Sequence, residues 1–196
     1  MAKTIRWWLL ALWMVFVPTH GAVLIIDGSG ILTGATGVQV GTQLYDVTFV
    51  DGTCAEALGA CDAAHFTFNN QTTAQAAAEA LLSFVLVGQF DANPGRILGC
   101  TATFCDVQTP YLIQSPPFTG VLVALAHNCN EIDAWCPDSV DGAYGFNINV
   151  STASSPSRVW AVWNSSVPEP DTLALLGLGL AGIAALRRRK HWPPAR

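Results

Sequence analysis

The middle of this chain is almost without positive charge. Between Ala22 and Ser166 there is no lysine, and the only cations are Arg96 and Arg158, whereas twelve acidic residues give this region a net charge of about −10. Nucleic acids and anionic lipid surfaces are bound by clustered Lys and Arg side chains. The sequence therefore excludes a nucleic-acid partner and predicts an acidic, soluble surface.

The sequence also lacks the local motifs of common catalytic sites. It contains no G-x-S-x-G nucleophile elbow, no H-E-x-x-H zinc motif and no EF-hand loop. Its central region holds two histidines, His65 and His127, which are expected in loops or at strand ends. We therefore expect a structural or binding role without catalysis.

Neither end of the chain has the run of about 20 apolar residues that a standard membrane helix needs. The C-terminal apolar run, residues 172–186, carries no charge and would span roughly 22 Å as a helix, against a hydrocarbon core of roughly 30 Å. However, this run has no polar face, and four cations follow it at 187–190, where they can extend the span. We expect a linker over 164–171, a membrane helix over 172–186 and a basic cytoplasmic tail over 187–196.

The N-terminus has the three parts of a secretory signal peptide. Lys3 and Arg6 supply the positive charge, Trp7 to Val17 form an eleven-residue apolar run, and small residues follow up to Ala22. The run is too short for a stable membrane anchor. We therefore expect a signal peptide over residues 1–21 and an exported domain over 22–163.

A short motif, Pro168-Glu169-Pro170, stands before the C-terminal apolar run, and Arg187, Arg188 and Arg189 follow that run. In this order the three parts resemble the PEP-CTERM sorting signal of Gram-negative bacteria. The resemblance implies an exosortase as partner, in addition to the secretion translocon and signal peptidase. It implies a protein that is exported through the inner membrane, anchored transiently and then placed at the cell surface or in the extracellular matrix. Extracellular polysaccharide is a further partner that the resemblance suggests.

Six cysteines lie in the predicted exported domain. An even number in an exported chain is typical of a disulfide framework, although six cysteines allow fifteen connectivities. Zinc is the alternative, but the spacings lack the C-x2-C pairs of structural zinc sites. The spacing favours three local bridges: Cys54 with Cys61, Cys100 with Cys105, and Cys129 with Cys136.

Four acids, Glu131, Asp133, Asp138 and Asp141, lie in or just after the segment between the last two cysteines. Carboxylates in a closed loop can bind Ca²⁺, the one cofactor that the sequence suggests, so a calcium-binding adhesion module is one alternative function. A secreted, anchored polysaccharide hydrolase is the other, and it would need two carboxylates facing each other across a cleft. A solvated acidic loop is the simplest interpretation.

The rest of the pattern predicts an α+β domain with a mostly antiparallel sheet, one packed helix and loops closed by disulfides. Gly41 and Thr42 form a two-residue turn between strands at 37–40 and 43–50. Apolar residues at helical spacing predict a helix over 72–87, begun by a capping box of Thr72 and Gln75.

Three further strands are expected after this helix. A short apolar run predicts a buried strand over 121–126, and residues 158–163 are expected to form the last strand. Alternation over 144–150 predicts a half-buried strand. Prolines at 110, 116 and 117 indicate that the stretch after Cys105 is broken up.

Overall fold

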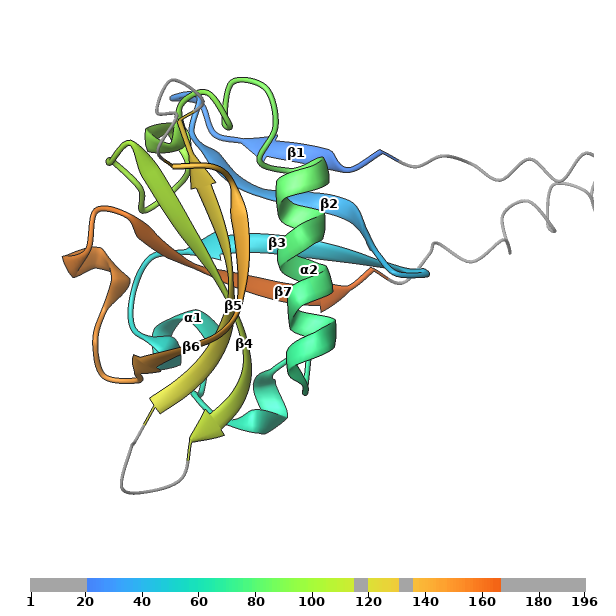
Figure 1. Cartoon of the computed structure of the whole chain (residues 1–196), viewed down its shortest axis with the longest axis vertical. Coiled ribbons are helices and arrows are strands. Elements are labelled where there is room, and N and C mark those ends of the chain that lie inside the picture. The colour runs from blue at the N-terminus through green and yellow to red at the C-terminus, as the bar shows by residue number, and fades with distance from the viewer. Residues whose placement is uncertain (1–20, 115–119, 131–135, 167–196) are drawn as a thin grey trace, which may run out of the picture.

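The computed structural model describes residues 21–114, 120–130 and 136–166. Within these ranges the chain forms one seven-stranded sheet with α2 (Gln71–Phe84) lying across one of its faces (Figure 1). The remaining helices are α1 (Cys54–Leu58) and the short 3-10 helices η1 (Ala63–His65), η2 (Pro94–Arg96) and η3 (Thr152–Ser154). The strands are β1 (Val23–Ile26), β2 (Leu32–Val40), β3 (Gln43–Val50), β4 (Phe104–Gln114), β5 (Gly120–Cys129), β6 (Ser139–Asn147) and β7 (Arg158–Ser165).

The predicted membrane segments fall outside the described residues. This holds for the signal peptide except for its last residue, and for the whole of the sorting helix (172–186) and the basic tail (187–196). Within the residues that the structure describes, no helix is long and apolar enough to cross a membrane.

The strand order is β1-β2-β3-β7-β4-β5-β6, and every neighbouring pair is antiparallel except β4 with β7. The parallel pairing is short and joins Asp106–Gln108 to Arg158–Trp160. The mostly antiparallel sheet with one packed helix is therefore confirmed. The last strand along the chain, β7, lies in the middle of the sheet and extends two residues into the predicted linker.

The predicted hairpin is present, and its turn has the expected chemistry. Val40 pairs with Gln43, and Gly41 between them has a φ of 60°. A positive φ at the first turn position, followed by a residue with negative φ, matches the type II′ turn that glycine favours there. The turn thereby sets the register in which Val38 pairs with Tyr45.

The predicted helix is present as α2, but its capping box of Thr72 and Gln75 is wrong. Asn70 is the N-cap, and its side-chain oxygen accepts a hydrogen bond from the backbone N–H of Thr73 at 3.0 Å. Asn is as strong an N-cap as Thr, so the helix begins from a cap two residues before the predicted one and keeps the same apolar face. The helix ends at Phe84, three residues short of the expected end.

Small side chains allow α2 to approach the sheet closely. Ala74, Ala77 and Ala78 are completely buried, as is Leu81 one turn further on, and α2 packs on β4, β5, β6 and β2. The predicted core face of the helix is confirmed. Together with the inward residues of the sheet, it forms the larger of two buried clusters.

Pro110 does not break the stretch after Cys105, contrary to the prediction. Pro110 lies inside β4, an eleven-residue strand. Proline has no N–H to donate and is tolerated where one side of a strand is unpaired. The pairing of β4 with β7 stops at Gln108, and the register with β5 shifts just after Pro110. Positions 116 and 117 lie outside the described residues.

The strand expected at 144–150 is displaced and more exposed than expected. The observed strand, β6, ends at Asn147 and lies at the edge of the sheet. Tyr144 and Val150, which the alternation placed on a buried face, are 46% and 54% exposed. The predicted buried strand is confirmed within β5, where Val121 and Val123 are completely buried.

The face of the sheet opposite α2 is covered by shorter elements. Both α1 and η3 contact β7, and Trp160 is buried there with Cys54 and Leu125. The helix α1 was not predicted; Thr53 and Glu56 form a capping box at its start. These short helices cover only part of that face. Polar side chains of β4, β5 and β7 lie on the part that they leave uncovered.

Candidate functional site

The three predicted disulfides are confirmed, and the six cysteines leave no free thiol. They differ in their surroundings. Cys100 and Cys105 are both buried in the core beneath α2, whereas the other two bridges each join a buried cysteine to a half-buried one. In Cys54–Cys61 the buried partner is Cys54, and in Cys129–Cys136 it is Cys129.

A row of polar side chains crosses three strands on the face opposite α2. Asp106 of β4 is paired with Arg158 of β7 on one side and with His127 of β5 on the other. The His127 Nδ1 lies 2.5 Å from the Asp106 Oδ1, and the Arg158 Nε lies 3.9 Å from the Asp106 Oδ2. Asp106 is 9% exposed, so its carboxylate is nearly enclosed by the two basic side chains. Burial of a carboxylate requires such partners.

The far side of the His127 ring contacts the third disulfide. The His127 Nε2 lies 3.0 Å from the Cys129 Sγ and 3.3 Å from the Cys136 Sγ. These three side chains would be within reach of one metal ion. Zinc requires thiolate sulfur, whereas here the two sulfur atoms are bonded to each other. The cluster in the structure is therefore a histidine against a disulfide, with a carboxylate behind it.

Only two of the four acids of the predicted cation site lie within the described residues. Glu131 and Asp133 lie outside the described residues. The Asp138 Oδ1 accepts a hydrogen bond from the Cys129 N–H at 2.8 Å, and Asp141 is exposed on β6 opposite Leu125. Desolvation raises the pKa of Asp138, and the nearby Asp91 adds to the rise, while the Cys129 N–H opposes it. Calcium binding by this set stays a prediction.

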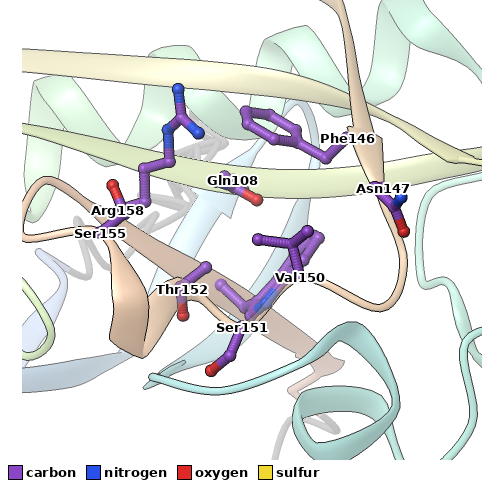
Figure 2. Close-up of a pocket in the computed structure, with 9 residues that line it drawn as sticks. Gln108, Phe146, Asn147, Val150, Ser151, Thr152, Ser155 and Arg158 are labelled. Carbon is purple, nitrogen blue, oxygen red and sulfur yellow. The ribbon is translucent and has the colours of Figure 1, made fainter.

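A small cavity lies beside the polar row (Figure 2). Figure 2 shows Arg158 and Phe146 on one side of it and Val150, Ser151 and Thr152 on the other, with Gln108 between them. Gln108 is 1% exposed, and both atoms of its amide lack a hydrogen-bond partner within the protein. The cavity measures about 20 Å³, which is enough for about one water molecule and too small for a sugar ring. A bound water is therefore the partner that fits Gln108.

A larger open hollow of about 310 Å³ lies between the β2–β3 hairpin and the start of α2. Its volume is at the lower limit of small-molecule sites. Tyr45 and Phe68 both line it, with their ring centroids 5.2 Å apart. The other residues that line it are neutral: Val40, Gly41, Thr42, Gln43, Thr67, Asn69, Thr73 and Ala76. Uncharged hydroxyl and amide groups beside aromatic rings suit a neutral, hydroxyl-rich ligand.

The polar row was not predicted from the sequence. His127 was expected at a strand end, but its pairing with Asp106 depends on the register between β4 and β5. One local signal was available. Residues two apart on a strand share a face, so His127 and Cys129 could have been placed together from the sequence alone.

Both ends of the described domain lie on the same side of the sheet. β1 begins and β7 ends there, beside the β2–β3 turn (Figure 1). The Ser166 N–H donates a hydrogen bond to the Leu44 carbonyl at 2.9 Å, so the pairing of the last strand continues to the end of the described chain. Whatever follows residue 166 is therefore connected directly to a central strand.

Residues 166–190 match the family model described as PEP-CTERM protein-sorting motif. The match begins one residue after β7 ends and includes the predicted motif residues Pro168-Glu169-Pro170 and the arginines at 187–189. No curated protein and no solved structure matches the chain. The chain thus carries a PEP-CTERM sorting signal, which implies export, processing by an exosortase and sorting to the cell envelope.

Proposed function

We propose that this chain is a structural or binding component of the cell envelope or extracellular matrix, acting without catalysis after exosortase processing. The sorting motif at 166–190 is the observation that carries this proposal. It follows the central strand β7 without a spacer, so the domain and its processing signal are joined rigidly up to residue 166.

The acids of the described residues support a non-catalytic role. A glycoside hydrolase needs two carboxylates about 5–10 Å apart across a cleft. Neither the small cavity nor the larger hollow is lined by an acidic residue. Asp106, the one buried acid among the described residues, is engaged by His127 and Arg158.

The larger hollow supports polysaccharide as the binding partner. Its lining has no charged side chain in a domain that is strongly acidic. A neutral saccharide avoids the repulsion that an anionic polymer would meet on this surface. Tyr45 supplies a half-buried ring, and Gln43 and Asn69 supply exposed amides at the rim.

Substitutions in the sorting motif test the processing step. We expect the double variant Pro168→Ala/Glu169→Ala to stay in the inner-membrane fraction at its unprocessed mass in a host that has an exosortase. Trp192→Ala lies outside the matched residues and is the control, expected to be processed normally. Normal mass and location of the motif variant would refute the sorting role.

Binding of neutral oligosaccharides to the full chain in detergent tests the polysaccharide partner. Gln43→Ala is expected to weaken binding about fivefold, because a hydrogen bond contributes about 1 kcal/mol. Gln89→Ala, an exposed glutamine away from the hollow, is expected to bind as the wild type does. Equal affinity of the two variants, or no binding by the wild type, would contradict a saccharide site at the hairpin.

A further inference from the structure

We propose that Cys129–Cys136 is a redox-active disulfide that exchanges with a small external thiol, with His127 as its proton donor and acceptor and Asp106 as the residue that positions His127. Among the described residues, His127 is the one histidine whose ring lies within hydrogen-bond distance of sulfur. This site is separate from the sorting motif and from the hollow at the hairpin.

The arrangement is that of a base-activated cysteine. Asp106 binds Nδ1 of the ring, which directs Nε2 toward the two sulfur atoms at 3.0 and 3.3 Å. A carboxylate on one ring nitrogen and a sulfur on the other give the same order of groups as in enzymes that activate a cysteine through histidine. The Arg158 guanidinium lies on the side of the other carboxylate oxygen, with its Nε 3.9 Å from Oδ2.

The burial of the two cysteines sets the direction of attack. Cys129 is 2% exposed, whereas Cys136 is half-buried and accessible to a small thiol. An external thiolate bonds to the Cys136 Sγ, the bond between the two protein sulfurs breaks, and its electron pair leaves on the Cys129 Sγ. Protonated His127 delivers the Nε2 proton to this sulfur, and its Nδ1–H stays hydrogen-bonded to Asp106.

A second external thiol completes the reduction of the disulfide. It attacks the mixed disulfide, releases the Cys136 thiol and forms a disulfide between the two external molecules. Two external thiols are thereby oxidised, and Cys129–Cys136 is reduced by two electrons. In the reverse direction neutral His127 takes the Cys129 proton, and the resulting thiolate is the nucleophile.

The chain contains its own matched control. Cys54–Cys61 has the same separation of seven residues and the same combination of one buried and one half-buried cysteine. An Asp–His pair, Asp62 with His65 at 2.8 Å, even lies next to Cys61 in the sequence. Among the described contacts, no histidine nitrogen lies against the sulfur atoms of Cys54–Cys61.

The test compares exchange rates at the three disulfides of the full chain. The oxidised protein in detergent is incubated with glutathione at pH 7, quenched with acid and alkylated, and each cysteine is followed by mass spectrometry of its chymotryptic peptide. We expect Cys129–Cys136 to open at least about tenfold faster than Cys54–Cys61, a smaller factor than the roughly 10²–10⁴-fold that general acid–base catalysis typically contributes. Equal rates at the two bridges would overturn the proposal.

Two histidine variants separate proton transfer from simple access. His127→Gln keeps a polar side chain but cannot transfer the proton, and it is expected to slow opening of Cys129–Cys136 by about tenfold or more, with Cys54–Cys61 unchanged. His65→Gln is expected to leave both rates unchanged. An unchanged rate in His127→Gln would refute the role of the histidine. Should that variant not fold, the comparison within the wild type decides alone.

Two variants test the positioning role of Asp106. Asp106→Asn removes the carboxylate that binds Nδ1 of the His127 ring and is expected to slow opening of Cys129–Cys136 severalfold, with the rate at Cys54–Cys61 unchanged. Asp106→Glu keeps a carboxylate and is expected to recover part of the lost rate. An unchanged rate in Asp106→Asn would refute the positioning role.

Discussion

The hydroxyl of Thr152 fastens the loop behind the small cavity to the end of β3, and its removal is the sharpest test of this packing. The hydroxyl donates to the Asp51 Oδ1 at 2.6 Å and accepts from the Gly52 N–H at 2.9 Å. Thr152 is 5% exposed. Thr152→Val keeps the shape of the side chain but leaves the buried Gly52 N–H without this acceptor and the Asp51 carboxylate without this donor.

The expected cost follows from these two bonds. An unsatisfied buried donor costs about 1–3 kcal/mol, and a hydrogen bond to a charged group contributes about 1.5–3 kcal/mol. Because the two effects share one hydroxyl and do not add fully, we expect the free energy of unfolding to fall by about 2–4 kcal/mol. For a domain of this size, the melting temperature would fall by about 5–15 °C.

Thermal unfolding of the full chain, followed by near-UV circular dichroism, measures this loss. Thr152→Ser is the matched control, because it keeps the hydroxyl and removes only one methyl group, worth about 1 kcal/mol. The reasoning predicts that the serine variant is clearly more stable than the valine variant. Equal melting temperatures for the two would show that the hydroxyl does not hold the loop.

Two further changes test the start of α2 and the acidic segment before β6. Asn70→Ala is expected to lower the free energy of unfolding in urea by about 1 kcal/mol, because it removes the N-cap of α2. Thr72→Ala is expected to change this free energy by no more than about 0.5 kcal/mol. The reverse order would favour the capping box of Thr72 and Gln75, which the structure does not show. Asp138→Asn is expected to stabilise the protein at neutral pH and to lose this advantage below about pH 4. The reason is that the Asp138 pKa is raised in the folded state, so the ionised carboxylate destabilises the fold. At low pH the carboxyl is protonated and this penalty disappears. A stabilisation that persists at pH 3 would contradict it.

The sequence was most informative where one local pattern decides the structure. The II′ turn at Gly41, the alanine face of α2 and the short cysteine separations each depend on neighbouring residues, and all three are confirmed. Prediction failed where partners distant in sequence decide. Pro110 is tolerated in β4 only because β7 pairs no further than Gln108, and no local pattern contains that information.

The candidate sites divide in the same way. The sorting motif at 168–170 is a contiguous signal, and it was identified from the sequence. The residues of the row, Asp106, His127 and Arg158, are 21 to 52 positions apart in the sequence. They meet because β4 pairs with β5 on one side and with β7 on the other. The sequence alone does not give the register between these strands, so the row could not be predicted from it.

The most direct test of the account is the mass and location of the mature protein in otherwise identical strains with and without exosortase. With the enzyme present, we expect the chain to reach the cell surface or matrix with its C-terminal segment removed near Pro168-Glu169-Pro170. Without the enzyme, we expect the C-terminal segment to be retained and the protein to stay with the inner membrane. The same mass and the same location in both strains would contradict the account.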